Sequence, residues 1–132
     1  MSLQVTSLNT LKEIAKGEVV ELPGFSSTPF VARLRQASLV NLVASGKIPN
    51  KLLGLATTFF ISDTEKLNKH LEKKDGIADM YEIMKIMANA CLVEPSLKDI
   101  EEARLELTDI QLTAIFNYSQ RGIDGLETFR NK

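Results

Sequence analysis

The sequence is poor in the side chains that carry most enzyme chemistry. It contains one cysteine, Cys91, one histidine, His70, and no tryptophan. A nucleophile or a base that works near neutral pH usually involves cysteine or histidine, and a zinc site would need carboxylates or a second chain besides these two residues. We therefore expect no enzyme activity, no catalytic residues, no cofactor and no metal site.

Other signals are also missing. A single cysteine forms no intramolecular disulfide, which favours a reducing compartment. Gly24, Gly46 and Gly54 stand singly and none precedes a Lys-Ser or Lys-Thr pair, so no phosphate-binding loop is present. No apolar run approaches the roughly 18 residues of a membrane span, and residues 1–16 lack the features of a signal peptide. These absences predict a cytoplasmic protein that does not bind nucleotides or insert into membranes.

The chain has no excess of charge of either sign. Its 16 basic and 17 acidic residues give a net charge of -1, which offers little attraction for nucleic acid or anionic lipid. The acidic residues toward the C-terminus lack the spacing of a calcium loop. We interpret them as a solvated helix surface: Glu94, Asp99, Glu101, Glu102, Glu106 and Asp109.

What the sequence does contain is the composition of a folded globular domain. Hydrophobic residues make up 44% and charged residues 25% of its 132 residues, well away from the signature of disorder. No repeat or long linker interrupts the pattern, so we expect a single domain over residues 1–132. The predicted class is α+β and mainly α-helical, with an N-terminal β-hairpin at about 18–35 packed on a bundle of short helices at about 37–130.

The N-terminal part begins with a short helix and continues into the hairpin. Ser7 is a plausible N-cap for a helix with one apolar stripe that stops at Gly17. Residues 18–22 and 30–35 then read as two strands, with Pro23-Gly24 and Pro29 bounding the loop between them. A two-stranded hairpin is marginal alone, so it must pack on the helices or pair with another copy of the protein.

The helical part contains one highly charged helix and two apolar ones. Residues 63–74 are expected on the surface, with His70 solvated. Helix 77–92 places Cys91 on an apolar stripe with the methionines, as a buried and inert thiol, together with Ile77, Met80, Ile83, Met84 and Met87. Thr108 and Gln111 have capping-box spacing and start a helix that is apolar around most of its circumference. Such a helix is either central to the core or shared with a partner.

Two long segments resemble the tail assembly chaperones of long-tailed siphophages of Gram-positive bacteria. The first is VELPGF followed by PFVARLRQASLVNLVASGKIPNKLL, similar to that family's N-terminal half. The second is VEPSLKDIEEARLELTDIQLTAIFNYSQRGIDGLETFR, similar to its C-terminal pattern. Together they cover well over half of the chain; the charged helix in residues 62–76 has no counterpart in the pattern.

This resemblance implies a small protein of the host cell cytoplasm that binds the phage tape-measure protein and keeps it soluble during tail assembly, without ATP. It implies a homo-oligomer, and members of the family are often also made in a frameshifted longer form. The family has no catalytic motif to transfer. We expect the tape-measure protein to contact Leu53, Phe59, Phe60, Met80, Met84 and Met87, because such apolar segments suit a helical client.

Self-association is expected through the hairpin edge or through Ile110, Ile115 and Phe116. Two other functions are weighed against the chaperone. A small DNA-binding or adaptor-type regulator has this size and helix content, but the candidate helices are apolar or acidic where a recognition helix is basic. A small enzyme would need a nucleophile without support from histidine or metal.

Overall fold

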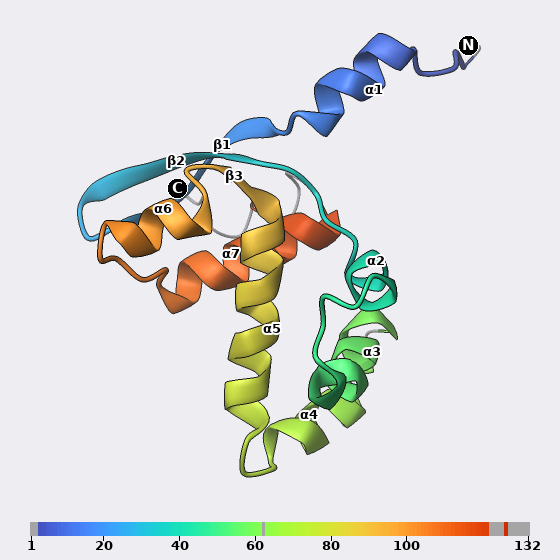
Figure 1. Cartoon of the computed structure of the whole chain (residues 1–132), viewed down its shortest axis with the longest axis vertical. Helices are drawn as coiled ribbons and strands as arrows, with labels where there is room; N and C mark the ends of the chain where they lie inside the picture. The colour runs from blue at the N-terminus through green and yellow to red at the C-terminus, as the bar shows by residue number, and fades with distance from the viewer. Residues whose placement is uncertain (1–2, 62, 122–125, 127–132) are drawn as a thin grey trace.

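The computed structural model describes residues 3–61, 63–121 and 126, and it confirms an α+β, mainly helical fold (Figure 1). None of the helices in these ranges has the length and apolar character to cross a bilayer. In chain order the elements are α1 (Leu8–Ala15), β1 (Glu18–Phe25), β2 (Thr28–Leu34), α2 (Leu39–Ala44), the 3-10 helix η1 (Asn50–Leu52), α3 (Leu53–Ile61), α4 (Thr64–Leu71), α5 (Gly76–Cys91), β3 (Leu92–Glu94), α6 (Leu97–Glu102) and α7 (Asp109–Arg121).

The predicted hairpin is present and its turn lies within the predicted loop, but its strands are longer than expected. β1 and β2 run antiparallel with Val20 opposite Ala32, and they meet at a tight turn beside Ser26, between Pro23 and Pro29. Gly24 allows this because a Cβ there would lie 2.1 Å from the backbone oxygen of Thr28, so only glycine permits the close approach of the strands.

The hairpin gains a third strand from its own chain, which the sequence did not indicate. β3 follows directly on α5 and pairs antiparallel with the end of β2, so that the sheet order is β1-β2-β3. The expected helix 77–92 therefore ends at Cys91. Pairing of Leu92 with Leu34 supplies part of the support that a two-stranded hairpin lacks.

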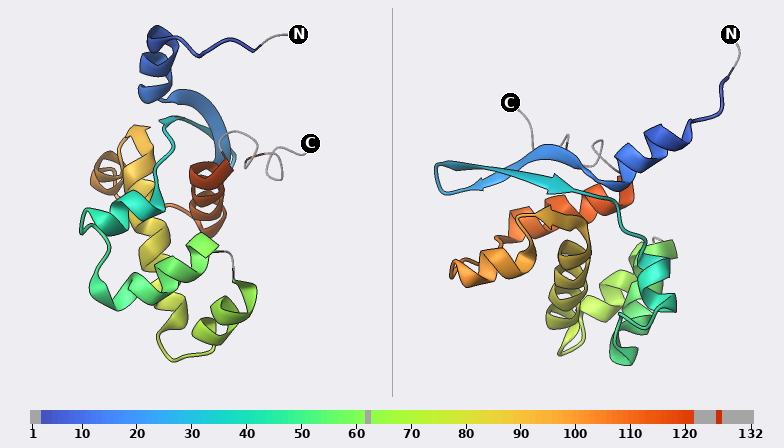
Figure 2. Two further views of the ribbon diagram at one scale, coloured as in Figure 1. Left: turned by 90° about the vertical axis from the view of Figure 1, so that its right-hand side faces the viewer. Right: turned by 45° about the horizontal axis from the view of Figure 1, so that its top comes forward.

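One face of the sheet covers the first hydrophobic core. α7 runs beneath it, as the right-hand view of Figure 2 shows, and the inward side chains of the strands meet those of α7. The buried residues of this core include Val20, Leu22, Ala32, Leu34, Cys91, Leu112 and Ile115. The opposite face of the sheet leaves Val19 and Val31 exposed.

The second core lies between α5 and the segment from α2 to α3. It contains Leu39, Ile48, Leu52, Leu55, Ile83 and Met87. α5 contributes to both cores, with Ala88 in the first and Ile83 in the second, and therefore connects the two cores (Figure 1).

Cys91 lies in the first core, which confirms the prediction that its thiol is buried. Burial raises the pKa of its thiol to about 11, and the backbone of Ala37 and the charge of Arg35 offset only part of that effect. At pH 8 only about 0.1% of such a thiol is the reactive thiolate.

We expect Cys91 to react with a disulfide reagent at pH 8 far more slowly in the native protein than in denaturant.

The protonated thiol of Cys91 also contributes to the free energy of unfolding, because its pKa is higher in the folded state than the unfolded value of about 9. This contribution is fully present below pH 9 and is lost as the pH rises toward 11. The loss amounts to about 2–3 kcal/mol in the free energy of unfolding. Denaturant titrations between pH 8 and 11 measure it, and Cys91→Ala should show a shallower decline. An equally steep decline in that variant would contradict the assignment.

Candidate partner-binding surface

The α3 residues expected to bind a client lie partly within the fold. Leu53 and Phe59 are half-buried and pack against the second core. The ring of Phe59 lies 5.0 Å, centroid to centroid, from that of Phe116 on α7. The side chain of Phe60 lies outside what the structure describes. Leu53 and Phe59 are thus only partly accessible to a partner.

The three methionines of α5 differ in exposure. Met80 and Met84 are half-buried, whereas Met87 is fully buried in the second core. A partner therefore reaches the first two in this conformation and not the third. The reason is position along the helix: α7 crosses α5 toward its C-terminal end, and the N-terminal half of α5 extends beyond α7 (Figure 1).

The sequence analysis missed two exposed residues on α5. Ile77, which the apolar stripe placed in the core, is 74% exposed, and Tyr81 is 43% exposed. Together with Met80 and Met84 they occupy positions i, i+3, i+4 and i+7, which share one face of a helix. We call Ile77, Met80, Tyr81 and Met84 the α5 face. The only signal in the sequence is that Ile77 stands in the first turn of its helix, directly after Asp75-Gly76.

A groove adjoins the α5 face. A cavity of about 360 Å³ lies between α5, α6 and the start of α7, and Tyr81 lines it from α5. Its other apolar lining residues are Leu97, Leu105, Leu107 and Leu112, of which Leu105 is the most exposed. Tyr81 therefore connects the exposed helix face with a depression large enough for one or two apolar side chains of a partner.

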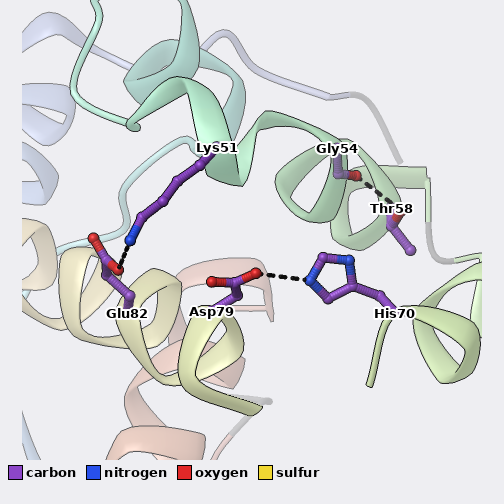
Figure 3. Close-up of polar contacts among 6 residues, drawn as sticks. All are labelled: Lys51, Gly54, Thr58, His70, Asp79 and Glu82. Carbon is purple, nitrogen blue, oxygen red and sulfur yellow. Dashed lines mark hydrogen bonds and ion pairs between the residues drawn. The ribbon is translucent and has the colours of Figure 1, made fainter. Parts of the chain in front are cut away.

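Polar side-chain pairs hold α5 on both sides of this face. Lys51 of η1 lies 3.2 Å from Glu82, and His70 of α4 lies 3.1 Å from Asp79 (Figure 3). On the side of the groove, Lys85 lies 3.2 Å from Glu101 of α6. These pairs are partly exposed, so each contributes little stability, but they define the orientation of the helix.

The pair of His70 corrects a prediction from the sequence, and the pair of Lys85 alters the pKa of that lysine. His70 was expected to be solvated, but packing of α4 on α5 leaves its side chain 19% exposed and beside Asp79, so that expectation is wrong. The hydrogen bond with Glu101, and its charge, raise the pKa of Lys85. Lys85 therefore stays cationic in the lining of the groove, one helical turn after Tyr81.

The residues expected to mediate self-association are split between surface and core. Ile110 is 59% exposed at the start of α7, Ile115 is fully buried, and Phe116 is half-buried against Phe59. Ile115 holds the sheet to α7 and is not available to a second copy in this conformation. The acidic residues from Glu94 to Asp109 are all exposed, as the interpretation of a solvated surface requires.

Comparisons with known proteins identify no relative of this chain. No family model, no curated protein and no solved structure matches the chain.

Proposed function

We propose that this protein is a bacteriophage tail assembly chaperone, which binds the tape-measure protein of a long-tailed siphophage in the host cytoplasm and keeps it soluble. The observation that carries the proposal is the α5 face. Four apolar side chains at helical spacing are held on a fixed helix beside a groove. This is the arrangement by which a domain binds the apolar side of a helical client.

The chemistry of the α5 face suits a long client with a varying sequence. Methionine is flexible and polarizable, so Met80 and Met84 adapt to side chains of different shape. Tyr81 offers a large apolar area with a polar end. A long helical protein with exposed apolar stripes aggregates unless they are covered, and many copies of a small binder would cover them.

The segments that carry the family resemblance support a shared scaffold. Gly24 of the LPGF segment permits the close approach of the two strands, and Gly46 of the SGKIPN segment ends α2 with a φ of +77°. Thr108 and Gln111 of the LTDIQ segment form the predicted capping box, with bonds of 2.9 and 3.1 Å. These segments build the sheet and the helix boundaries, whereas the α5 face lies between them in the sequence.

The alternative of a DNA-binding regulator finds little support in the described parts of α5 and α7. α5 carries Asp79 and Glu82 beside its one lysine, Lys85, and both Glu82 and Lys85 are engaged in ion pairs. α7 begins with Asp109 and presents Ile110 to solvent. A recognition helix needs several basic and amide side chains on its exposed side, and the acidic and apolar residues named here do not supply them.

Co-expression with the tape-measure protein of its own phage tests the proposal. We expect a soluble complex with several copies of this chain per client, seen by size-exclusion chromatography with light scattering. The double variant Ile77→Glu/Tyr81→Glu should reduce the soluble client by at least about tenfold, because it places two carboxylates where the client's apolar side chains would be buried.

The matched control is Ala78→Glu/Asn89→Glu, which adds the same charge at exposed positions of α5 outside the α5 face. It should leave the client soluble. Circular dichroism and thermal unfolding of both variants establish that they fold. An insoluble client beside unbound wild-type protein would refute the chaperone proposal, and a folded Ile77→Glu/Tyr81→Glu variant that still solubilises the client would refute the α5 face as the site.

A further inference from the structure

Arg104 occupies a backbone position that usually belongs to glycine. At the end of α6 the amide of Arg104 donates to the carbonyl oxygen of Glu101 at 2.9 Å. The next amide, that of Leu105, donates to the carbonyl oxygen of Ile100 at 3.1 Å. These two bonds form a Schellman motif, in which the first residue after the C-cap adopts a left-handed conformation and is usually glycine. Arg104 accordingly has a φ of +65°.

The end of α2 contains the same motif with the usual residue. There the amides of Gly46 and Lys47 make the corresponding bonds to Val43 and Leu42, and Gly46 has a φ of +77°. Glycine adopts this conformation freely because it has no Cβ, whereas the Cβ of any other residue comes close to a backbone oxygen. The motif at the end of α6 therefore requires a left-handed backbone but no arginine, which is less stable there than glycine.

The side chain of Arg104 belongs to the groove beside the α5 face. It is exposed, and it lines the cavity of about 360 Å³ together with Tyr81. The same cavity is lined by Leu97 and Leu112, which are buried and form an apolar floor. A partner side chain that enters the groove thus contacts apolar groups and has the guanidinium group of Arg104 beside it.

The charged groups of the groove leave Arg104 without a partner in the described ranges. Lys85 lies 3.2 Å from Glu101. Glu101 and, to a smaller extent, Glu106 raise the pKa of Lys85, so both carboxylates of the lining lie near its ammonium group. Arg104 forms no ion pair with residues 3–61, 63–121 or 126. Its positive charge is therefore available to a negatively charged group of a partner.

We propose that Arg104 is a specificity-determining residue of the client site, which pairs with a carboxylate of the client beside the apolar side chain that enters the groove. This inference rests on the proposed function and adds the class of client segment, an apolar residue with an aspartate or glutamate about one helical turn away. The planar guanidinium group suits the role because it bonds both oxygens of a carboxylate. A binding role also accounts for arginine where glycine would be more stable, since functional sites often reduce stability.

Substitution of Arg104 tests the inference, because binding and stability should change in opposite directions. Without client, Arg104→Gly should lower the equilibrium constant of unfolding about fivefold in a urea titration, since the strained backbone is relieved. Binding is measured by diluting the denatured tape-measure protein of its own phage into increasing concentrations of the full chain. The concentration that keeps half of this client soluble should rise about five- to tenfold for Arg104→Gly and Arg104→Asn, which lack the ion pair.

Two controls separate the ion pair from the effect of net charge. Arg104→Lys keeps the charge but not the planar group, so it should lose only part of the binding. Lys98→Gln removes one positive charge from the exposed surface of α6 outside the groove, and it should bind as the wild type does. Raising the salt from about 50 to 500 mM should weaken the wild type more than Arg104→Asn, because salt screens the charge that only the wild type retains.

The outcomes distinguish this inference from the chaperone proposal. If the wild type and Arg104→Asn keep the client soluble equally well, the role of Arg104 is refuted and the chaperone proposal stands. An Arg104→Gly protein less stable than the wild type would also overturn the inference, because Arg104 would then have a partner within the fold. So would an equal loss of binding in Lys98→Gln, which would indicate a general effect of charge. A wild type that does not keep the client soluble would overturn both.

Discussion

Met87→Glu is expected to unfold the protein, although Met87 belongs to the residues that the sequence placed in the client-binding site. Met87 is fully buried, and its neighbours in the second core are aliphatic side chains such as Ile83 and Leu52. A carboxylate there would be desolvated without a partner, at a cost of more than about 4 kcal/mol. Domains of this kind are stable by only about 5–15 kcal/mol in total. Circular dichroism and thermal unfolding should show a loss of most helical signal or a much lower melting temperature.

The control for this variant is Met87→Leu, which keeps the volume and the apolar character of the side chain. It should cost less than about 1.5 kcal/mol. A second control introduces the same carboxylate at the exposed position Ile77. Ile77→Glu should change the free energy of unfolding by no more than about 0.5 kcal/mol. A Met87→Glu protein with the wild-type melting temperature would show that the second core is not packed as described. Loss of client binding by Met87→Glu would therefore say nothing about the site.

Gln111→Ala is expected to cost about 2–4 kcal/mol, the second large effect. Gln111 is fully buried, and its two side-chain groups serve different parts of the fold. Its carbonyl oxygen accepts from the backbone of Thr108 at 2.9 Å, and its amide nitrogen donates to the backbone oxygen of Pro23 at 2.8 Å. Truncation leaves both groups without their partner in a buried site and opens a cavity. Urea denaturation, with an unchanged slope, measures the loss.

Two further variants separate the contributions of this residue. Gln111→Glu keeps the acceptor for Thr108 but places a second oxygen against the carbonyl of Pro23, so it should also be destabilised. Thr113→Ala on the exposed side of α7 removes a hydroxyl that donates to the backbone oxygen of Asp109, and it should change stability by no more than about 0.5 kcal/mol. If Gln111→Ala were as stable as Thr113→Ala, the bond to Pro23 would not hold α7 to the hairpin.

Local features of the fold were predictable because they depend on residues close in sequence. The Ser7 cap, the antiparallel hairpin, the Thr108–Gln111 capping box and the burial of Cys91 all agree with the structure. Each results from a short-range rule on capping or periodicity. The strand ends of the hairpin are an exception, since Pro23-Gly24 and Pro29 were placed in the loop but lie in β1 and β2, where Gly24 allows a close pairing of the strands.

The candidate surface was less predictable, because exposure depends on which elements pack together. Met80, Met84 and Met87 look alike in the sequence, and Ile77 fits their stripe equally well. Only the packing of other elements against α5 decides that Met87 is buried in the second core and that Ile77 remains in solvent. His70 was likewise predicted to be solvated, because the sequence does not show that α4 packs on α5 and brings the imidazole beside Asp79.

The sequence by itself determined the class of the fold, the helix boundaries and the apolar side of each amphipathic element. These follow from periodicity and from hydrogen bonds that span only a few residues. The tertiary structure alone decided that β3 completes the sheet, that Gln111 joins α7 to Pro23 of β1, 88 residues away in sequence, and that α1 projects with its apolar stripe uncovered. Such outcomes depend on competition among many apolar surfaces for burial, and a one-dimensional pattern does not specify which two surfaces meet.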